Sequence, residues 1–182
     1  MNRRVRAAIA VVTVLLVSLT LTAGPLRPPA AHAAPTGYSV LTDQQKRELL
    51  LSVLEKFVPH AESFWRDSDI PEPNTGRYLA TGSGVTQPRG AGDIAFVYAT
   101  LLKARPRQRS FGGVAREVML DHTIRSIRYT ALTNKLSGAG YDQWGGGTWQ
   151  ASLETYLWGF AAQVLWDRLD EDTRALVRKV VE

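Results

Sequence analysis

Apolar side chains recur every three or four residues along most of this chain, which is the spacing of an amphipathic helix. The first such run follows a capping-box pattern at Thr42 and Gln45 and stops before Pro59, so it predicts a helix over about 42–58. The same spacing predicts four more helices. They cover about 91–104, 114–132, 148–168 and the residues from Asp170 onward.

Two of these predicted helices, over 91–104 and 148–168, carry apolar residues on nearly every side. A helix that is apolar all round is surrounded by protein, so we expect both to be enclosed. No segment keeps the period-two alternation of a strand. The predicted fold class is therefore all-α, built of consecutive helical hairpins. Long loops over about 59–90 and 138–147 separate the helices, and loops of such length tend to be functional.

The first 33 residues have a different pattern. Basic residues precede an apolar run over about 7–21, and a small-x-small cleavage site follows at Ala31-His32-Ala33. This order predicts a secretory signal peptide over 1–33 and a mature helical domain over 34–182. The apolar run breaks at Gly24 and falls short of the roughly 20 residues that span a membrane. We expect a secreted, extracellular protein with no stable membrane anchor after cleavage, the alternative being retention of this segment as an anchor.

The whole chain has a net charge of +5, which suggests a nucleic-acid or membrane-surface protein. The predicted signal peptide holds four of the 22 basic residues and no acidic one, so its removal leaves 18 basic against 17 acidic residues. A nearly neutral domain lacks the basic excess that phosphate binding requires, and we expect no nucleic-acid partner. The one dense basic run, over 103–109, is typical of a solvated loop after a helix.

The chain has no cysteine, and only His60 and His122 remain as histidines after residue 33. Disulfides, thiolate metal ligands and cysteine nucleophiles are thereby excluded, and the common His-rich zinc motifs are absent. We therefore expect no metal and no cofactor.

Three polar residues share one side of the predicted helix over 114–132. His122, Arg125 and Tyr129 lie at i, i+3 and i+7 and offer a proton shuttle, an anion clamp and a phenolic acid or base. Glu154 is a further catalytic candidate, because burial would raise the pKa of its carboxyl and suit it to act as a general acid. The alternative is that the stripe is an ordinary polar face with an arginine reaching solvent.

Aromatic and hydrogen-bonding side chains gather in both long loops. Rings of this kind stack on sugars while the polar groups bind hydroxyls, which makes sugar binding a hypothesis for these residues. The candidates are Trp65, Arg66, Asp67, Arg89 and Asp93 in and after the first loop, and Asp142, Trp144, Trp149 and Gln150 in and after the second. The alternatives are that Trp144 and Trp149 fill the core and that Asp93 only favours a helix N-terminus.

Three segments also carry a resemblance to a known family. They are Pro88-Arg89-Gly90-Ala91-Gly92-Asp93, Tyr141 to Gln150, and Leu165-Trp166-Asp167-Arg168-Leu169-Asp170. With the signal peptide and the helical hairpins, they make the chain resemble the opening part of the (α/α) toroid of secreted polysaccharide lyases and some glycoside hydrolases. A complete toroid has more helices than the five predicted here. The chain is thus the first part of a larger protein, a truncated reading frame, or a smaller helical domain without a toroid.

The resemblance implies that loops on one rim line a substrate cleft. It also implies that His122, Arg125, Tyr129, Tyr141 or Asn134 is analogous to the residues with which lyases act beside an acidic sugar. The preferred hypothesis is a secreted carbohydrate-active protein, lyase-like or hydrolase-like, that acts on a polysaccharide. The alternatives are a non-catalytic exported helical module that binds a glycan or a protein partner, and an inactive truncated fragment.

Overall fold

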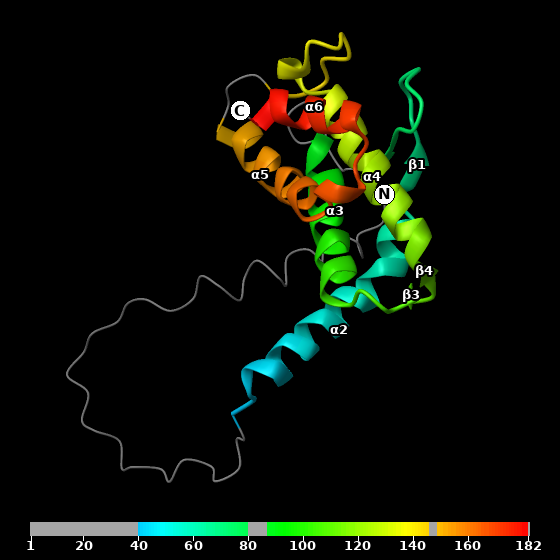
Figure 1. Cartoon of the computed structure of the whole chain (residues 1–182), viewed down its shortest axis with the longest axis vertical. Coiled ribbons are helices and arrows are strands. Elements are labelled where there is room, and N and C mark those ends of the chain that lie inside the picture. The colour runs from blue at the N-terminus through cyan, green and yellow to red at the C-terminus, as the bar shows by residue number, and fades with distance from the viewer. Residues whose placement is uncertain (1–39, 80–86, 146–148, 182) are drawn as a thin grey trace, which may run out of the picture. The chain divides into compact units, whose positions relative to one another are not determined.

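The computed structural model describes residues 40–79, 87–145 and 149–181, and the predicted signal peptide lies outside them. The chain from Leu41 onward packs as one unit (Figure 1). The described residues are mostly helical, as the apolar spacing predicts. In chain order the elements are α2 (Asp43–Glu62), β1 (Trp65–Asp67), β2 (Gly76–Tyr78), α3 (Gln87–Ala104), β3 (Ser110–Phe111), β4 (Val114–Ala115), α4 (Arg116–Leu132), η2 (Lys135–Ser137), α5 (Trp149–Val164), η3 (Trp166–Arg168) and α6 (Glu171–Val181).

Helix α2 begins where the sequence predicts, but it ends four residues beyond the predicted end. The Thr42 hydroxyl accepts a hydrogen bond from the Gln45 backbone N–H at 3.2 Å, which completes the expected capping box. The predicted end at Val58 is wrong, because the helix continues through Pro59 to Glu62. Val58 and Ala61 are fully buried on either side of the proline, and their packing offsets the hydrogen bond that proline cannot donate. The extra turn places Glu62 at a half-buried position.

The expectation that the chain contains no strands is also wrong. In a short antiparallel hairpin, β1 pairs with β2 so that Trp65 faces Tyr78 and Asp67 faces Gly76. A second hairpin joins β3 to β4 through Gly112 and Gly113, whose φ angles of 56° and 89° suit a two-residue turn. Strands of two or three residues are too short to produce a readable alternation, which is why the sequence pattern does not show them.

Helix α3 passes through the middle of the unit, with α5 on one side and α4 on the other (Figure 1). Among its described side chains only Asp93 and Lys103 are exposed, while Ala95, Tyr98 and Leu101 are buried, in agreement with the prediction that it is enclosed. Helix α5 is different. Its Trp158 and Ala161 are buried against the core, but Tyr156 and Phe160 are 64% and 42% exposed. The prediction that α5 is enclosed is therefore wrong for one of its faces.

The β3–β4 turn offers a matched pair of substitutions. A Cβ on Gly112 would lie 2.7 Å from Pro59 Cδ and 2.9 Å from the Glu55 carbonyl oxygen, whereas a Cβ on Gly113 would meet nothing within 4 Å. Both residues have positive φ, so Gly113→Ala should cost only the backbone strain of about 1–2 kcal/mol. Gly112→Ala should cost about 1–3 kcal/mol more, because α2 has to shift. Urea unfolding measures both, and equal losses would contradict the close packing of this turn on α2.

Candidate functional site

The polar stripe of α4 lies against the segment that joins α2 to β2. His122 contacts Glu62, Arg125 contacts Asp67, and Tyr129 contacts Asp69. The three residues thus share one side of the helix, as their spacing predicts, and each has an acidic partner from the same stretch of chain. These contacts form two clusters, one around Glu62 and one around Tyr129.

The first cluster, called here the Glu62 cluster, consists of Glu62, Trp65, Tyr78, Tyr98 and His122. The hydroxyls of Tyr78 and Tyr98 donate to Glu62 Oε1 at 2.9 and 2.8 Å, and His122 Nδ1 lies 2.7 Å from Glu62 Oε2. The donors come from β2, α3 and α4, and the carboxylate comes from the last turn of α2. Both oxygens of Glu62 are therefore occupied by neighbouring elements.

The protonation states in this cluster follow from its hydrogen bonds. Burial by itself raises the pKa of Glu62, but the hydrogen bonds from His122, Tyr98 and Tyr78 outweigh it and hold that pKa below its ordinary value of 4.5. Burial and the nearby carboxylate raise the pKa of both tyrosines, so their hydroxyls remain donors. Because a carboxylate can only accept, the His122 hydrogen sits on Nδ1, and Nε2 is the acceptor of the neutral ring. No described residue forms a hydrogen bond with Nε2.

Trp65 lies flat on the His122 ring, with centroids 3.9 Å apart and planes 8° from parallel. The Arg125 guanidinium lies 5.2 Å from the centroid of the same indole. Glycine at position 76 makes this arrangement possible, because a Cβ there would lie 2.4 Å from the indole carbons. Arg125 also donates to Asp67 Oδ1 at 3.0 Å and to the Thr75 carbonyl at 2.9 Å. The imidazole, the indole and the guanidinium are therefore held together by the β1–β2 hairpin.

The second cluster forms around Tyr129. Its hydroxyl donates to Asp69 Oδ1 at 2.8 Å, lies 3.0 Å from Gln143 Oε1 and accepts from Arg77 Nη1 at 3.2 Å. Arg77 also pairs with Asp69 at 2.9 Å. Burial, followed by the Asp69 hydrogen bond, raises the pKa of Tyr129 to about 12. The phenol therefore stays protonated at neutral pH, which suits a donor and not a base.

Tyr141 and Asp142 lie in the loop before α5. The Tyr141 hydroxyl donates to Glu72 Oε1 at 3.0 Å, which raises the pKa of the phenol, and Asp142 is exposed. Tyr141 therefore contacts neither His122 nor Arg125 through a described hydrogen bond, and it belongs with the Tyr129 side of the structure.

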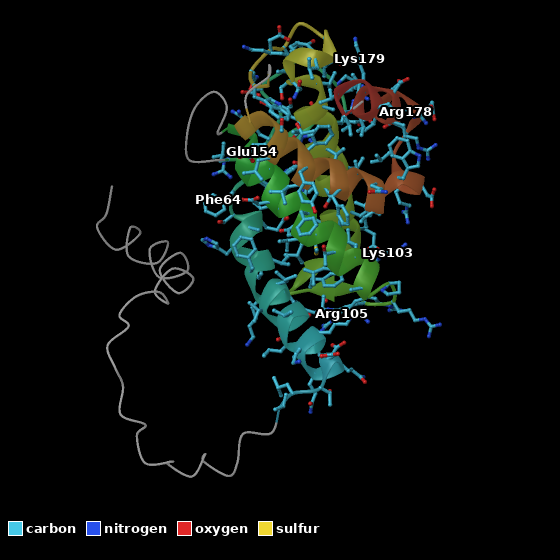
Figure 2. The ribbon with its side chains drawn as sticks, turned by 90° about the vertical axis from the view of Figure 1, so that its left-hand side faces the viewer. Phe64, Lys103, Arg105, Glu154, Arg178 and Lys179 are labelled. Carbon is cyan, nitrogen blue, oxygen red and sulfur yellow. The ribbon has the colours of Figure 1, made fainter. Side chains whose placement is uncertain are left out.

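Three of the candidate residues are buried in the core. The Trp144 indole is 2% exposed and donates to the Thr130 carbonyl at 2.9 Å, so it packs inside the domain as the alternative interpretation expects. Asn134 is equally buried, and its side chain accepts from the Leu136 backbone N–H at 2.8 Å. Glu154 is 1% exposed in the second turn of α5, and in Figure 2 it lies on the side of the unit opposite to Lys103 and Arg178.

The remaining candidates either lie at the surface or have side chains outside the part of the chain that the structure describes. Arg66 and Asp67 are exposed on β1, and Asp93 is exposed on α3. The side chains of Arg89, Trp149 and Gln150 lie outside the described part of the chain. Within the described ranges, no set of three or more acidic or histidine side chains is placed to hold a metal ion. No helix in those ranges combines the length and apolarity that a membrane span requires.

Sequence reasoning missed Glu62, Tyr78 and Tyr98. Glu62 follows a proline that ordinarily ends a helix, and Tyr98 lies in an otherwise apolar run, where a hydroxyl gives no sign of its partner. A polar atom on a helix predicted to be enclosed requires a partner, and that requirement was the one available signal for Tyr98.

We compared the chain with protein-family models, curated proteins and solved structures. No protein-family model, curated protein or solved structure matches this chain.

The Glu62 cluster generates a pH-dependent prediction. Glu62→Gln should lower the free energy of unfolding by about 2 kcal/mol at pH 7, because a charged acceptor of three hydrogen bonds is lost. The folded-state pKa is lowered, so the stability from this carboxylate is present above about pH 4.5 and is lost as pH falls through the folded value. Wild type and variant should therefore converge in acid.

Urea unfolding at pH 7 and at pH 3 measures this difference. Glu117→Gln is the control, because Glu117 is an exposed carboxylate in the first turn of α4. A constant gap between wild type and Glu62→Gln at both pH values would show that the carboxylate charge is not what stabilises the cluster.

Proposed function

We propose that the protein is a secreted carbohydrate-active enzyme that acts on a polysaccharide by a lyase reaction, with His122 as its acid–base group. The observation that carries the proposal is the pairing of His122 Nδ1 with Glu62 Oε2 at 2.7 Å. This pairing directs Nε2 away from the carboxylate, and the negative charge of Glu62 stabilises the imidazolium that forms when Nε2 takes a proton. The His122 side chain is 16% exposed, so part of it reaches solvent.

Arg125 supports the choice of an acidic sugar as substrate. Its guanidinium lies one helical turn from His122, is 25% exposed, and is held by Trp65 and Asp67. In the proposed reaction Arg125 pairs with the uronic carboxylate and His122 Nε2 removes the proton from C5. The released electron pair forms the C4–C5 double bond as the C4–O bond breaks, and the leaving oxygen takes its proton from the His122 imidazolium, which returns to the neutral ring.

The state of Glu62 favours a lyase over a hydrolase. A glycosidase requires a carboxylic acid with a raised pKa and a second carboxylate beside it. Glu62 has a lowered pKa, and both of its oxygens are hydrogen-bonded to protein groups. It is suited to orient His122 and not to act on substrate itself.

We also propose that the helical hairpins are the opening part of an (α/α) toroid. Support comes from apolar side chains that remain exposed on two of the described helices. They are Leu49, Val53 and Phe57 on α2, and Leu153 on α5. In toroids and other closed helical folds, neighbouring helices pack against such apolar faces and bury them.

A second candidate function is a non-catalytic module that binds a glycan. The observation that favours it is the internal pairing of Arg125, whose hydrogen bonds to Asp67 and the Thr75 carbonyl already satisfy part of its guanidinium. In this case Trp65, which is half-buried, supplies the sugar-contacting surface.

A panel of uronic polysaccharides, monitored by the absorbance of new unsaturated ends, tests the enzyme. Wild type should act on at least one member, and His122→Gln should lower kcat by about 10²–10⁴-fold. The control is His60→Gln, which alters the other described histidine and should leave kcat unchanged. Full activity of His122→Gln would remove His122 from the mechanism.

If the wild type produces no absorbance of unsaturated ends with any member of the panel, the lyase hypothesis is rejected. Saturable binding to the same polysaccharides, lost in Trp65→Ala, would then support the binding module.

A further inference from the structure

An apolar surface extends across α2, α5 and α6, and none of its lining residues belongs to the Glu62 cluster. It is formed by two open grooves of about 820 and 840 Å³. The first is lined by Leu50 and Leu54 of α2 and by Val164 of α5, and the second by Tyr156 of α5 and Val177 of α6. Phe160 lines both grooves, so the two adjoin at its ring, and together they are called here the Phe160 surface.

The side chains of the Phe160 surface are exposed to a degree that is unusual for large apolar residues. Leu50 is 65% exposed, Tyr156 64%, Val181 53% and Phe160 42%. Single apolar residues scattered over a surface are normal in proteins, but a larger apolar patch with a polar rim marks an interaction site.

The rim of the first groove is basic. Arg47 on α2 and Lys103 on α3 are exposed and form no ion pair with any described residue. Lys46 lies on the same rim and pairs with Asp43 at 3.1 Å, so the acidic charge there is already matched. The one charged residue that lines the second groove is Arg178 of α6, which pairs with Glu171 at 3.1 Å, so the unmatched basic charge lies at the first groove. Figure 2 shows Lys103 and Arg178 at the same edge of the unit.

We propose that the Phe160 surface binds an amphipathic helix of another protein, with acidic residues on both sides of its apolar face. Apolar residues at helical spacing on the partner would enter the two grooves, and the acidic residues would meet Arg47 and Lys103. The grooves are hollows that run over three helices, and a convex helix fills such a shape.

A second copy of this chain fits less well, because a two-fold contact would bring two basic rims together. An open apolar hollow that spans three helices is also a poor match for a small ligand, which is usually enclosed on most sides. The proposed function does not depend on this surface, so either proposal can fail without the other.

A peptide pair tests the inference. The probe is a synthetic helix with leucine at i, i+3, i+4 and i+7 and glutamate on both flanks, and its partner has lysine in place of every glutamate. The glutamate peptide should bind the full chain in fluorescence anisotropy at least about tenfold more tightly than the lysine peptide. The double variant Arg47→Glu with Lys103→Glu should reverse that order.

The control is Arg107→Glu, which alters an exposed basic residue outside both grooves and should leave both affinities unchanged. Phe160→Ala should weaken the glutamate peptide about tenfold, and circular dichroism checks that this variant is folded. Absent binding, or equal binding of the two peptides, would overturn the proposal. A dimer in solution that Phe160→Asp dissociates would overturn it in favour of a second copy, and binding of anionic vesicles without binding of the peptide would overturn it in favour of a membrane surface.

Discussion

The carboxylate of Glu62 is the point at which four elements of the domain meet. It belongs to the last turn of α2, and its donors belong to β2, α3 and α4. Glu62 is half-buried, and these donors favour its charged form, since burial alone would favour the neutral acid. The position of the β1–β2 hairpin over α4, and with it the stacking of Trp65 on His122, therefore depends on one extra turn of helix after a proline.

The helices are predictable because their signals are local. The capping box at Thr42, the apolar run of α3 and the polar stripe of α4 each depend on residues within a few positions of one another. The partners of the stripe are not predictable in that way, because Glu62 and His122 are 60 residues apart in the sequence. Pro59 conceals the last turn of α2, since the cost of a proline inside a helix is visible in the sequence while the packing that offsets it is not.

The tryptophans show why residue type alone does not separate a binding group from a packing group. Trp144 and Trp158 meet edge to face in the core and are fully buried. Trp65 lies instead in the hairpin, between His122 and Arg125, and is half-buried. Trp65 and Trp144 satisfy the same compositional pattern, since each is an aromatic residue in a predicted loop that contains glycine. They are distinguished by the burial of the ring, and the buried Trp144 also donates its indole N–H to the Thr130 carbonyl.

The Phe160 surface also affects how the isolated domain behaves in solution. At low ionic strength the basic rim makes neighbouring molecules repel one another where their apolar hollows would otherwise touch. Salt shortens the reach of that repulsion to about 8 Å at physiological ionic strength, while it leaves the attraction between apolar groups in place. The colloidal stability of the protein is therefore coupled to ionic strength through two exposed cations, Arg47 on α2 and Lys103 on α3.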